Sequence, residues 1–539
     1  MKITAEQVTR ELKSAMREKA GRGKHGMTRQ NEINERFYIG DQWHGAGCGD
    51  DRPLVRQNVI RRIADYKMSV VGSEPTAVTF AAEGVACNDT IKKAVSAWKR
   101  GETADGEIDG TRMAAVLSDQ FMHTAERVQF DHLKQQVLLS SYITGTGVLY
   151  TYWDDTVKTG LFADTARTQP ISGDIACEVL HIDNVFAGDA AIENLQDQPY
   201  ILITQQKSVE SLQKAARRFG GSGWRDIRPA ANVTRPDTPP KATVITRFWK
   251  EADAQGVLRV YGMQVADKAI IRPKWCLGIS RYPLATFRWT TRSGDVYGES
   301  EITHLIPNQI AINRMLTAGV WSMMMTGMPI MVVNGDVVTG AVTNDPGQII
   351  PVYGSADDVD KAIHYVEPPA YSSQFTAGIS TLISDTLSQA GVNSMLTGEV
   401  RPDNASAIMA AREMSLQPLK LIRNRFFTFC EDVARIWVEF WARMYGTRPL
   451  KIEYEGGVRY VTLDMAACEN MLWSVKVDVA ESVVGDQATT MDILNRLFER
   501  EVITARQYVS RLPAGSIPRQ HRLLQELQEK EGEYGTSQQ

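Results

Sequence analysis

Three pairs of adjacent aspartates are the residues with the clearest capacity for chemistry. They are Asp50–Asp51, Asp154–Asp155 and Asp357–Asp358, and each pair could supply half of a two-metal site. Each pair also lies in a turn-like stretch, where neighbouring acidic residues are common. Solvated turns are therefore the favoured interpretation, and the sequence predicts no catalytic residue among them.

Motifs that bind nucleotides, metals or cofactors are missing from the sequence. Neither a GxxxxGK[ST] phosphate cradle nor an HExxH zinc motif occurs. His44 and Cys48 are spaced as metal ligands can be, but no second pair accompanies them. Gly145 to Gly147 follow a predicted helix and precede a strand, the reverse of a dinucleotide-binding turn, so we predict a helix cap there. We expect no metal, no cofactor and no enzymatic activity, and therefore hydrolysis of neither ATP nor DNA.

Composition narrows the class of protein. The chain has 539 residues, of which 43% are apolar and 23% charged, as in ordinary soluble proteins of this size. A net charge of −4 argues against a general nucleic-acid coat, although not against a surface that DNA slides past. Six cysteines without paired spacing indicate a reducing compartment. The N-terminus lacks the apolar core of a signal peptide, and the apolar run 319–333 is too short to span a bilayer, so no membrane segment is expected.

The elements that would position any site are organised around one long helix, predicted from Asn404 to Tyr445. From Leu419 onward its apolar residues recur every three or four positions, and a second apolar row lies beside the first, so the helix should be buried on several sides. Asp403 or Asn404 can cap its start, Gly446 can end it, and Pro418 should kink it. The alternative is a long core helix of an ordinary large enzyme.

The order of the remaining elements indicates an α+β chain with an insertion on a helical stalk. The body begins with helices, including one long amphipathic helix predicted over 113–142, and continues with alternating strands. A helix capped by Ser300 then leads into a turn-rich, acidic, β-rich segment, and a helix over 372–389 leads back. After the long helix we predict a hairpin with a Gly456–Gly457 turn, an alternating strand at 473–482, and polar helices.

Two residue clusters have both an ordinary and a functional interpretation. The methionines Met323, Met324, Met325, Met328 and Met331 could form an adaptable subunit contact, but core filling is the favoured prediction. The aromatic residues of the long helix recur at helical spacing without interleaved basic residues, so we predict core packing rather than a base-stacking platform. These aromatic residues are Phe426, Phe427, Phe429, Trp437, Phe440 and Trp441.

Three stretches, together with this element order, resemble the portal proteins of tailed double-stranded DNA bacteriophages and prophages, which are ring-shaped connectors at one capsid vertex. The first is RFYIGDQW, followed downstream by RPLVRQNVIRRIADYKMSVVGSEP, which is similar to a portal N-terminal pattern. The second, DVYGESEITHLIPNQIAINRM, resembles the start of a portal stem helix. The third, GVNSMLTGEVRPDNASAIMAAREMSLQPLKLIRNRF, resembles a tunnel loop that enters a long kinked helix.

The resemblance covers roughly residues 32–485 and implies a portal-type fold. This fold has a mixed α/β wing, a helical stem, a small β-rich clip, a long kinked helix after a tunnel loop, and a helical C-terminal crown. The implied divisions are the wing at 1–297, a stem helix at 298–327, the clip at 328–370, a second stem helix at 371–390, the tunnel loop at 391–404, the long kinked helix at 405–446, the C-terminal β part of the wing at 447–484, and the crown and tail at 485–539.

The resemblance also implies partners and site residues. It implies a homo-oligomeric ring of twelve copies through which DNA is packaged and ejected, docked to a large terminase subunit, a head–tail adaptor, and the major capsid and scaffolding proteins. Such a ring is assembled in the host cytoplasm and located in the virion. Expected docking residues of the clip are Asp336, Asp345, Asp357, Asp358 and Asp360. Expected tunnel-loop residues that contact DNA are Gly391, Asn393, Ser394, Gly398, Glu399, Arg401 and Asn404.

Two other functions remain open at this point. One is a nucleic-acid-processing enzyme with unrecognised motifs, against which the missing phosphate cradle and metal cluster stand. The other is a different ring-forming structural channel protein, such as a secretion-channel component, against which the missing signal peptide stands.

Overall fold

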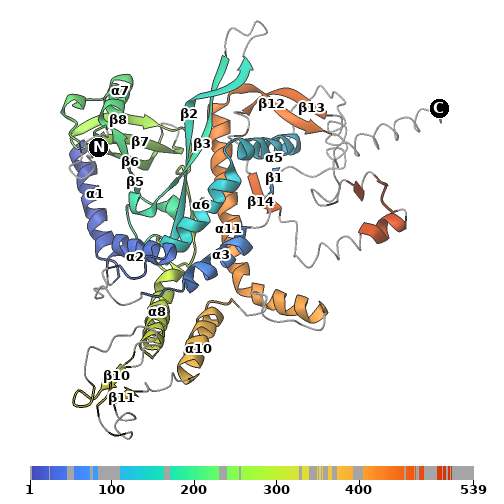
Figure 1. Ribbon diagram of the computed structural model, residues 1–539. Helices are drawn as coiled ribbons and strands as arrows, with labels where there is room; N and C mark the ends of the chain where they lie inside the picture. The colour runs from blue at the N-terminus through green and yellow to red at the C-terminus, as the bar shows by residue number, and fades with distance from the viewer. Residues whose placement is uncertain are drawn as a thin grey trace.

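The computed structural model shows a mixed α+β chain (Figure 1), as the sequence predicts. The structure describes residues 3–23, 25–44, 54–72, 77–82, 110–162, 170–229, 239–253, 256–326, 330–338, 349, 351–353, 355, 362–366, 373–392, 405–454, 457–465, 468, 473–478, 494–500, 502–505, 508–509 and 512.

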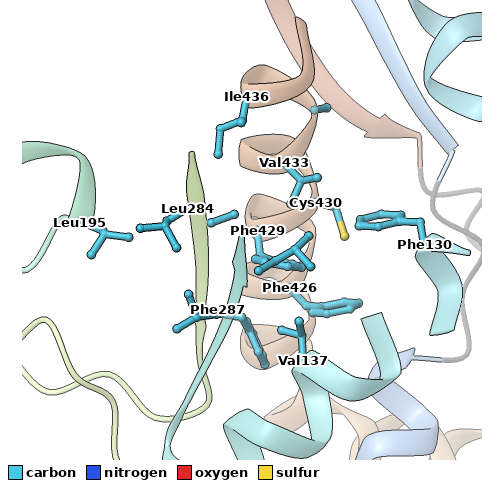
Figure 2. Close-up of a cluster of buried hydrophobic side chains, with 14 of the residues drawn as sticks. Phe130, Val137, Leu195, Leu284, Phe287, Phe426, Phe429, Cys430, Val433 and Ile436 are labelled. Atoms are coloured by element: carbon cyan, nitrogen blue, oxygen red, sulfur yellow. The ribbon is translucent and has the colours of Figure 1, made fainter. Parts of the chain in front are cut away.

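The long helix α11 (Ala405–Met444) runs through the middle of the body (Figure 1). Its side chains fill the main hydrophobic core, in which Trp437 and Trp441 are fully buried. Figure 2 shows one part of this core, in which α11 packs between β9 (Leu284–Arg288) and α6 (Phe130–Thr144). The labelled side chains are Phe426, Phe429, Cys430, Val433 and Ile436 of α11, Leu284 and Phe287 of β9, Phe130 and Val137 of α6, and Leu195. The predicted buried helix and its aromatic core are therefore confirmed, although Phe427 is only half-buried.

The predicted kink of α11 at Pro418 and its predicted end at Gly446 are both found in the structure. Pro418 lies inside the helix, and Figure 1 shows the lighter-coloured beginning of α11 turned away from the vertical remainder. A proline removes one N–H and crowds the preceding turn, which explains a bend. Gly446 follows the helix with a φ of 57°, the left-handed conformation that glycine adopts readily. The predicted cap residues Asp403 and Asn404 lie outside the described residues.

The single long helix predicted over 113–142 is wrong. The chain forms two helices, α5 (Gly110–Arg127) and α6, with Gln129 between them at a φ of 54°. The break turns Phe130 inward, where its ring lies 6.0 Å from Phe121 and 5.5 Å from Trp437, centroid to centroid. Neither glycine nor proline marks the break, which coincides with the packing of the Phe130 ring against these two aromatic residues.

Two antiparallel sheets form the body beside α11. The first has the order β3-β2-β9, and the second is the meander β4-β5-β6-β7-β8. Their remaining strands are β2 (Thr146–Phe162), β3 (Pro170–Leu180), β4 (Val185–Ala187), β5 (Tyr200–Ser208), β6 (Lys241–Ala252), β7 (Leu258–Ala266) and β8 (Ala269–Cys276). Alternate residues of β6 and β7 contribute to two different apolar clusters, so α1 (Ala5–Ala20) and α7 (Val209–Phe219) cover opposite faces of the meander.

The C-terminal strands return to the beginning of the chain. β14 (Trp473–Asp478) pairs antiparallel with β1 (Ala77–Ala82). The hairpin of β12 (Thr447–Tyr454) and β13 (Gly457–Asp464) is confirmed. Its turn is shifted by one residue, since Tyr454 pairs with Gly457 and the chain between them is Glu455–Gly456 rather than Gly456–Gly457.

A buried lysine fastens α1 to the body. Lys19 is 2% exposed, and its Nζ donates to the carbonyl oxygens of Ile182 (2.6 Å) and Val185 (2.5 Å). The same ammonium group lies over the rings of Phe186 and Tyr297, 4.3 and 4.9 Å from their centroids. Burial lowers the pKa of Lys19 to about 7, because an apolar environment disfavours the charged form.

We expect this lysine to make the stability of the protein depend on pH. Between pH 7 and 10.5 the unfolded chain binds more protons at Lys19 than the folded chain does, so the free energy of unfolding should rise with pH in this range. Urea unfolding at several pH values should show this rise, and the variant Lys19→Met should lose it. The exposed Lys13 of the same helix supplies the control, Lys13→Met. An identical pH profile for the wild type and Lys19→Met would contradict the assignment.

Candidate functional site

The insertion between β9 and α11 forms a stalk with a small sheet at its end. α8 (Glu301–Thr326) and α10 (Ser373–Gln389) leave the same side of the body, and β10 (Ile330–Val333) and β11 (Ile363–Val366) lie at their far end (Figure 1). The two strands pair antiparallel, from Ile330 with Val366 to Val333 with Ile363. The helices are joined by a hydrogen bond from Asn308 Nδ2 to Thr386 Oγ1 (3.2 Å). The predicted helices and strand-like segment are thus confirmed as elements.

The first turn of α8 is held by side chains from several distant elements. Ser300 Oγ accepts from the Ile302 N–H (3.2 Å), as a capping residue does, and donates to the Tyr142 carbonyl (2.7 Å). Glu301 binds both the Lys67 ammonium of α3 (Val59–Gly72) and the Trp289 indole N–H, the latter at 3.0 Å. The predicted cap is therefore confirmed, and it also ties α8 to the end of α6.

Two glycines allow the end of α6 to touch the chain before α8. Gly145 ends α6 with a φ of 87°, and its N–H donates to the Ser141 carbonyl at 2.8 Å, so the predicted helix cap is confirmed. A Cβ atom on Gly145 would lie only 2.4 Å from the Gly298 carbonyl oxygen. No larger residue fits this backbone contact.

Gln309 of α8 is the centre of a buried amide network. Its side chain is 1% exposed, and Oε1 accepts from the N–H groups of Val59 (3.0 Å) and Ile60 (3.3 Å) at the start of α3. Its Nε2 donates to the carbonyl of Gln57 (2.6 Å) and to Asn313 Oδ1 (2.9 Å). Because the first N–H groups of a helix have no partner within it, Gln309 caps α3 from another part of the chain.

Asn313 extends the network to the segment that follows α2 (Met27–Ile39). Asn313 is 2% exposed, and its Nδ2 donates to Gln42 Oε1 at 2.6 Å, while its Oδ1 accepts from the Gln57 N–H at 3.2 Å. Trp43 Nε1 donates to the Val55 carbonyl (3.1 Å), which holds the chain before α3 against the chain after α2. Gln42 and Trp43 belong to the GDQW stretch, and Gln309 and Asn313 to NQIAIN. Two stretches more than 250 residues apart thus meet at the root of the stalk.

The methionines of α8 are placed differently from the prediction. Met323 and Met324 are 53% and 49% exposed near the far end of the helix, so the favoured prediction of core filling is wrong for these two residues. The side chains of Met325, Met328 and Met331 lie outside the described residues. Val332 of β10 is also exposed, at 50%. Near its end the stalk therefore presents apolar side chains that the single chain does not cover.

Most predicted site residues lie outside the part of the chain that the structure describes. Gly391 directly follows α10 and has a φ of 71°, and Asp336 is exposed just after β10, where its N–H donates to Asn334 Oδ1 at 3.1 Å. The other residues predicted for the clip and the tunnel loop are not described; they are Asp345, Asp357, Asp358, Asp360, Asn393, Ser394, Gly398, Glu399, Arg401 and Asn404.

Of the three predicted aspartate pairs, Asp154–Asp155 lies in the described part of the chain. Asp154 accepts from the Thr156 N–H (2.9 Å) and hydroxyl (2.7 Å), which lowers the pKa of its carboxyl group. Its neighbour Asp155 is exposed, so the predicted solvation is confirmed, although the pair lies in β2 at a register shift and not in a turn. Within the described ranges, no group of three or more potential metal ligands occurs and no helix is long and apolar enough to cross a membrane.

The buried amide network of Gln309 and Asn313 was not predicted from the sequence. Gln309 and Asn313 are four residues apart on a face that otherwise carries Leu305, Ile312 and Leu316, and buried polar residues at helical spacing are the signal that was available. Their partners could not be identified from the sequence, because Gln42 and Gln57 lie in irregular chain.

A scan against models of known protein families gives no match, and a search of curated proteins gives none either.

Proposed function

We propose that the chain is a portal ring subunit at one capsid vertex of a tailed double-stranded DNA bacteriophage or prophage. Twelve copies close a ring through a head-to-tail interface, and double-stranded DNA passes through the axial channel during packaging and ejection. The ring docks the large terminase subunit, which supplies the ATPase activity, together with adaptor, capsid and scaffolding proteins. The subunit is not an enzyme, and its contribution is geometric.

The observation that carries this proposal is the stalk and its anchorage. Two helices leave the body on one side, a small sheet lies at their far end, and a 40-residue helix follows them into the core (Figure 1). In the proposed assignment these are the stem, the clip and the long kinked helix. The root of the stem is joined to the wing by Gln309 and Asn313, which belong, like Gln42, to stretches that resemble portal proteins.

The exposed methionines support a repeated contact between copies. Methionine is flexible and apolar, so it suits an interface whose two sides change position relative to each other. Covering Met323 and Met324 with a neighbouring stem would remove apolar surface that one chain leaves in water.

Native mass spectrometry of the purified protein tests the proposal. We expect a closed ring of about a dozen copies, because a head-to-tail interface with a fixed rotation closes on itself. Electron microscopy of the same sample should show a central channel. A stable monomer at micromolar concentration would overturn the proposal.

The loop 391–404 is proposed to face the channel, because it joins α10 to α11. Replacing residues 394–399 by a shorter Gly-Ser link should leave assembly unchanged and reduce the amount of DNA that particles package or retain. The measurement is the genome length recovered from purified particles, with wild-type particles as the control. Particles that fill and hold complete genomes would show that the loop has no such role.

A further inference from the structure

α7 and the meander sheet lie at the end of the body far from the stalk (Figure 1), and they carry a group of arginines. This group has five arginines. They belong to α7, to the short 3-10 helix η3 (Trp224–Asp226), to the segment that directly follows η3, and to β8. We call these residues the α7 arginine surface. They are Arg217, Arg218, Arg225, Arg228 and Arg272, of which all but Arg272 are exposed.

Aromatic rings hold most of these guanidinium groups in place. The Cζ atoms of Arg217 and Arg225 lie 4.2 and 5.0 Å from the centroid of the Trp224 ring. The Cζ atom of Arg272 lies 4.4 Å from the Phe219 centroid and 4.1 Å from that of Trp275. A guanidinium group that contacts an aromatic face keeps its N–H edge available, so the stacked groups are oriented for a planar anion before it binds.

The surface has more positive than negative charge. Asp155, 3.6 Å from Arg218, is exposed, and Glu210 pairs with Lys214 at 2.6 Å. Among the described residues, no carboxylate oxygen forms an ion pair with Arg217, Arg225 or Arg228. Burial is the main cause that lowers the pKa of Arg272; Tyr150 and the negative charge of Asp155 oppose this shift, and the positive charge of Arg218 adds to it. An anion placed between these groups would therefore gain favourable interactions with several of them.

The backbone beneath the surface is held by caps, hydrogen bonds and apolar packing. Ser208 caps α7, Gly220 ends it with a φ of 71°, and Ser222 exchanges two backbone hydrogen bonds of 2.9 Å with Ile270 of β8. The inner side of α7 is buried through Leu212 and Ala216. Guanidinium groups on such a support lose little conformational freedom when a ligand binds.

We propose that the α7 arginine surface binds an acidic segment of another protein. Arginine pairs with carboxylates through two parallel hydrogen bonds, and arginine and tryptophan together are typical of the energetic centres of protein interfaces. Nucleic acid is the weaker candidate, because two guanidinium groups already contact the Trp224 ring that a base would need for stacking. This surface is separate from the stalk, so the inference does not depend on the proposed portal function.

Fluorescence anisotropy of the full-length protein tests this proposal with two probes. The first is a short fluorescein-labelled peptide of glutamate, aspartate and leucine, and the second is a labelled DNA duplex. The test variant is Arg217→Glu/Arg225→Glu. Its control, Arg10→Glu/Arg29→Glu, makes the same change in net charge at two exposed arginines of α1 and α2.

We expect the acidic peptide to bind the wild type and the control alike, and the test variant at least about tenfold more weakly. Binding should weaken as salt is added, because the contacts are charged and exposed. Circular dichroism melting must show that the variants remain folded; if the double variant unfolds, Arg217→Ala and Arg225→Ala replace it. Equal peptide affinity for the wild type and a folded test variant would overturn the proposal. The proposal would also be overturned if the wild type bound the DNA duplex more tightly than the peptide and the test variant did not bind the duplex. That result would identify a surface for nucleic acid.

Discussion

Replacing Gln309 by leucine is expected to lower the free energy of unfolding by about 3–5 kcal/mol, because several buried polar groups lose their partner at once. The side chain accepts from Val59 and Ile60, and donates to Gln57 and Asn313, at a site that is 1% exposed. Leucine fills a similar volume but makes no hydrogen bond. Urea unfolding at fixed protein concentration measures the loss.

Two further variants show whether the loss of stability comes from the buried network or from the removal of any glutamine side chain. Gln136 of α6 is exposed and its side chain bonds only within its own helix, to His132, so Gln136→Leu should change stability by less than about 0.5 kcal/mol. Gln309→Glu keeps the acceptor for Val59 and Ile60 but places an acceptor against the Gln57 carbonyl. Its loss should be at least as large as that of Gln309→Leu, because a buried carboxylate without a positively charged partner is strongly unfavourable. A Gln309→Leu protein as stable as Gln136→Leu would contradict the role assigned to the network.

The variant Met323→Asp/Met324→Asp is expected to abolish ring assembly while leaving the subunit folded. Both side chains are about half exposed in the single chain, so two carboxylates are tolerated there in a monomer. In the proposed ring the same positions would be covered by a neighbour, and an unpaired buried carboxylate is strongly unfavourable. The unfavourable term recurs at every interface of the ring. Native mass spectrometry should therefore show monomers or small oligomers in place of the ring.

Met122 of α5 supplies a matched control. It is 58% exposed but lies in the body, apart from the stalk. Met122→Asp should assemble like the wild type. If the Met122 variant loses the ring and the double stalk variant retains it, the contact between copies lies on the body and not on the stem.

Much of the local structure could be predicted because its signals are local. The apolar rows of α11, the Ser300 cap and the Gly446 stop each depend on neighbouring residues, and each is found in the structure. The glycine at 145 was also predicted as a cap. Its contact with Gly298 was not predicted, since the two residues are distant in sequence.

The wrong predictions share a physical origin in long-range packing. The residues on each side of Gln129 have a helical pattern, but the helix breaks there, and Phe130 packs against Trp437 of a distant helix. For the same reason an apolar pattern did not distinguish the exposed Met323 and Met324 from core residues. Gln57 and Gln42, which bond to Gln309 and Asn313, lie in irregular chain, where no periodic pattern indicates which side chain faces the helix.

The candidate site was less predictable than the fold. Its expected residues were selected by resemblance, and of these only Gly391 and Asp336 lie in the described part of the chain. The residues that join stalk and body were visible in the sequence only as two amides on an apolar helix face. What the sequence does provide is the order of elements, which the helices of the stalk and the long helix α11 follow in the structure.

The pairing of β1 with β14 sets a limit on when the protein can fold during its synthesis. Thr79 and Lys476, which share a hydrogen bond, are 397 residues apart. At about 5–20 residues per second, the ribosome needs roughly 20–80 seconds to make the chain between them. Until β14 is made, β1 has no partner strand, and until residue 444 is made the core also lacks its central helix α11. Nascent chains should therefore remain dependent on chaperones until most of the polypeptide has emerged, and fragments that end before β14 should aggregate.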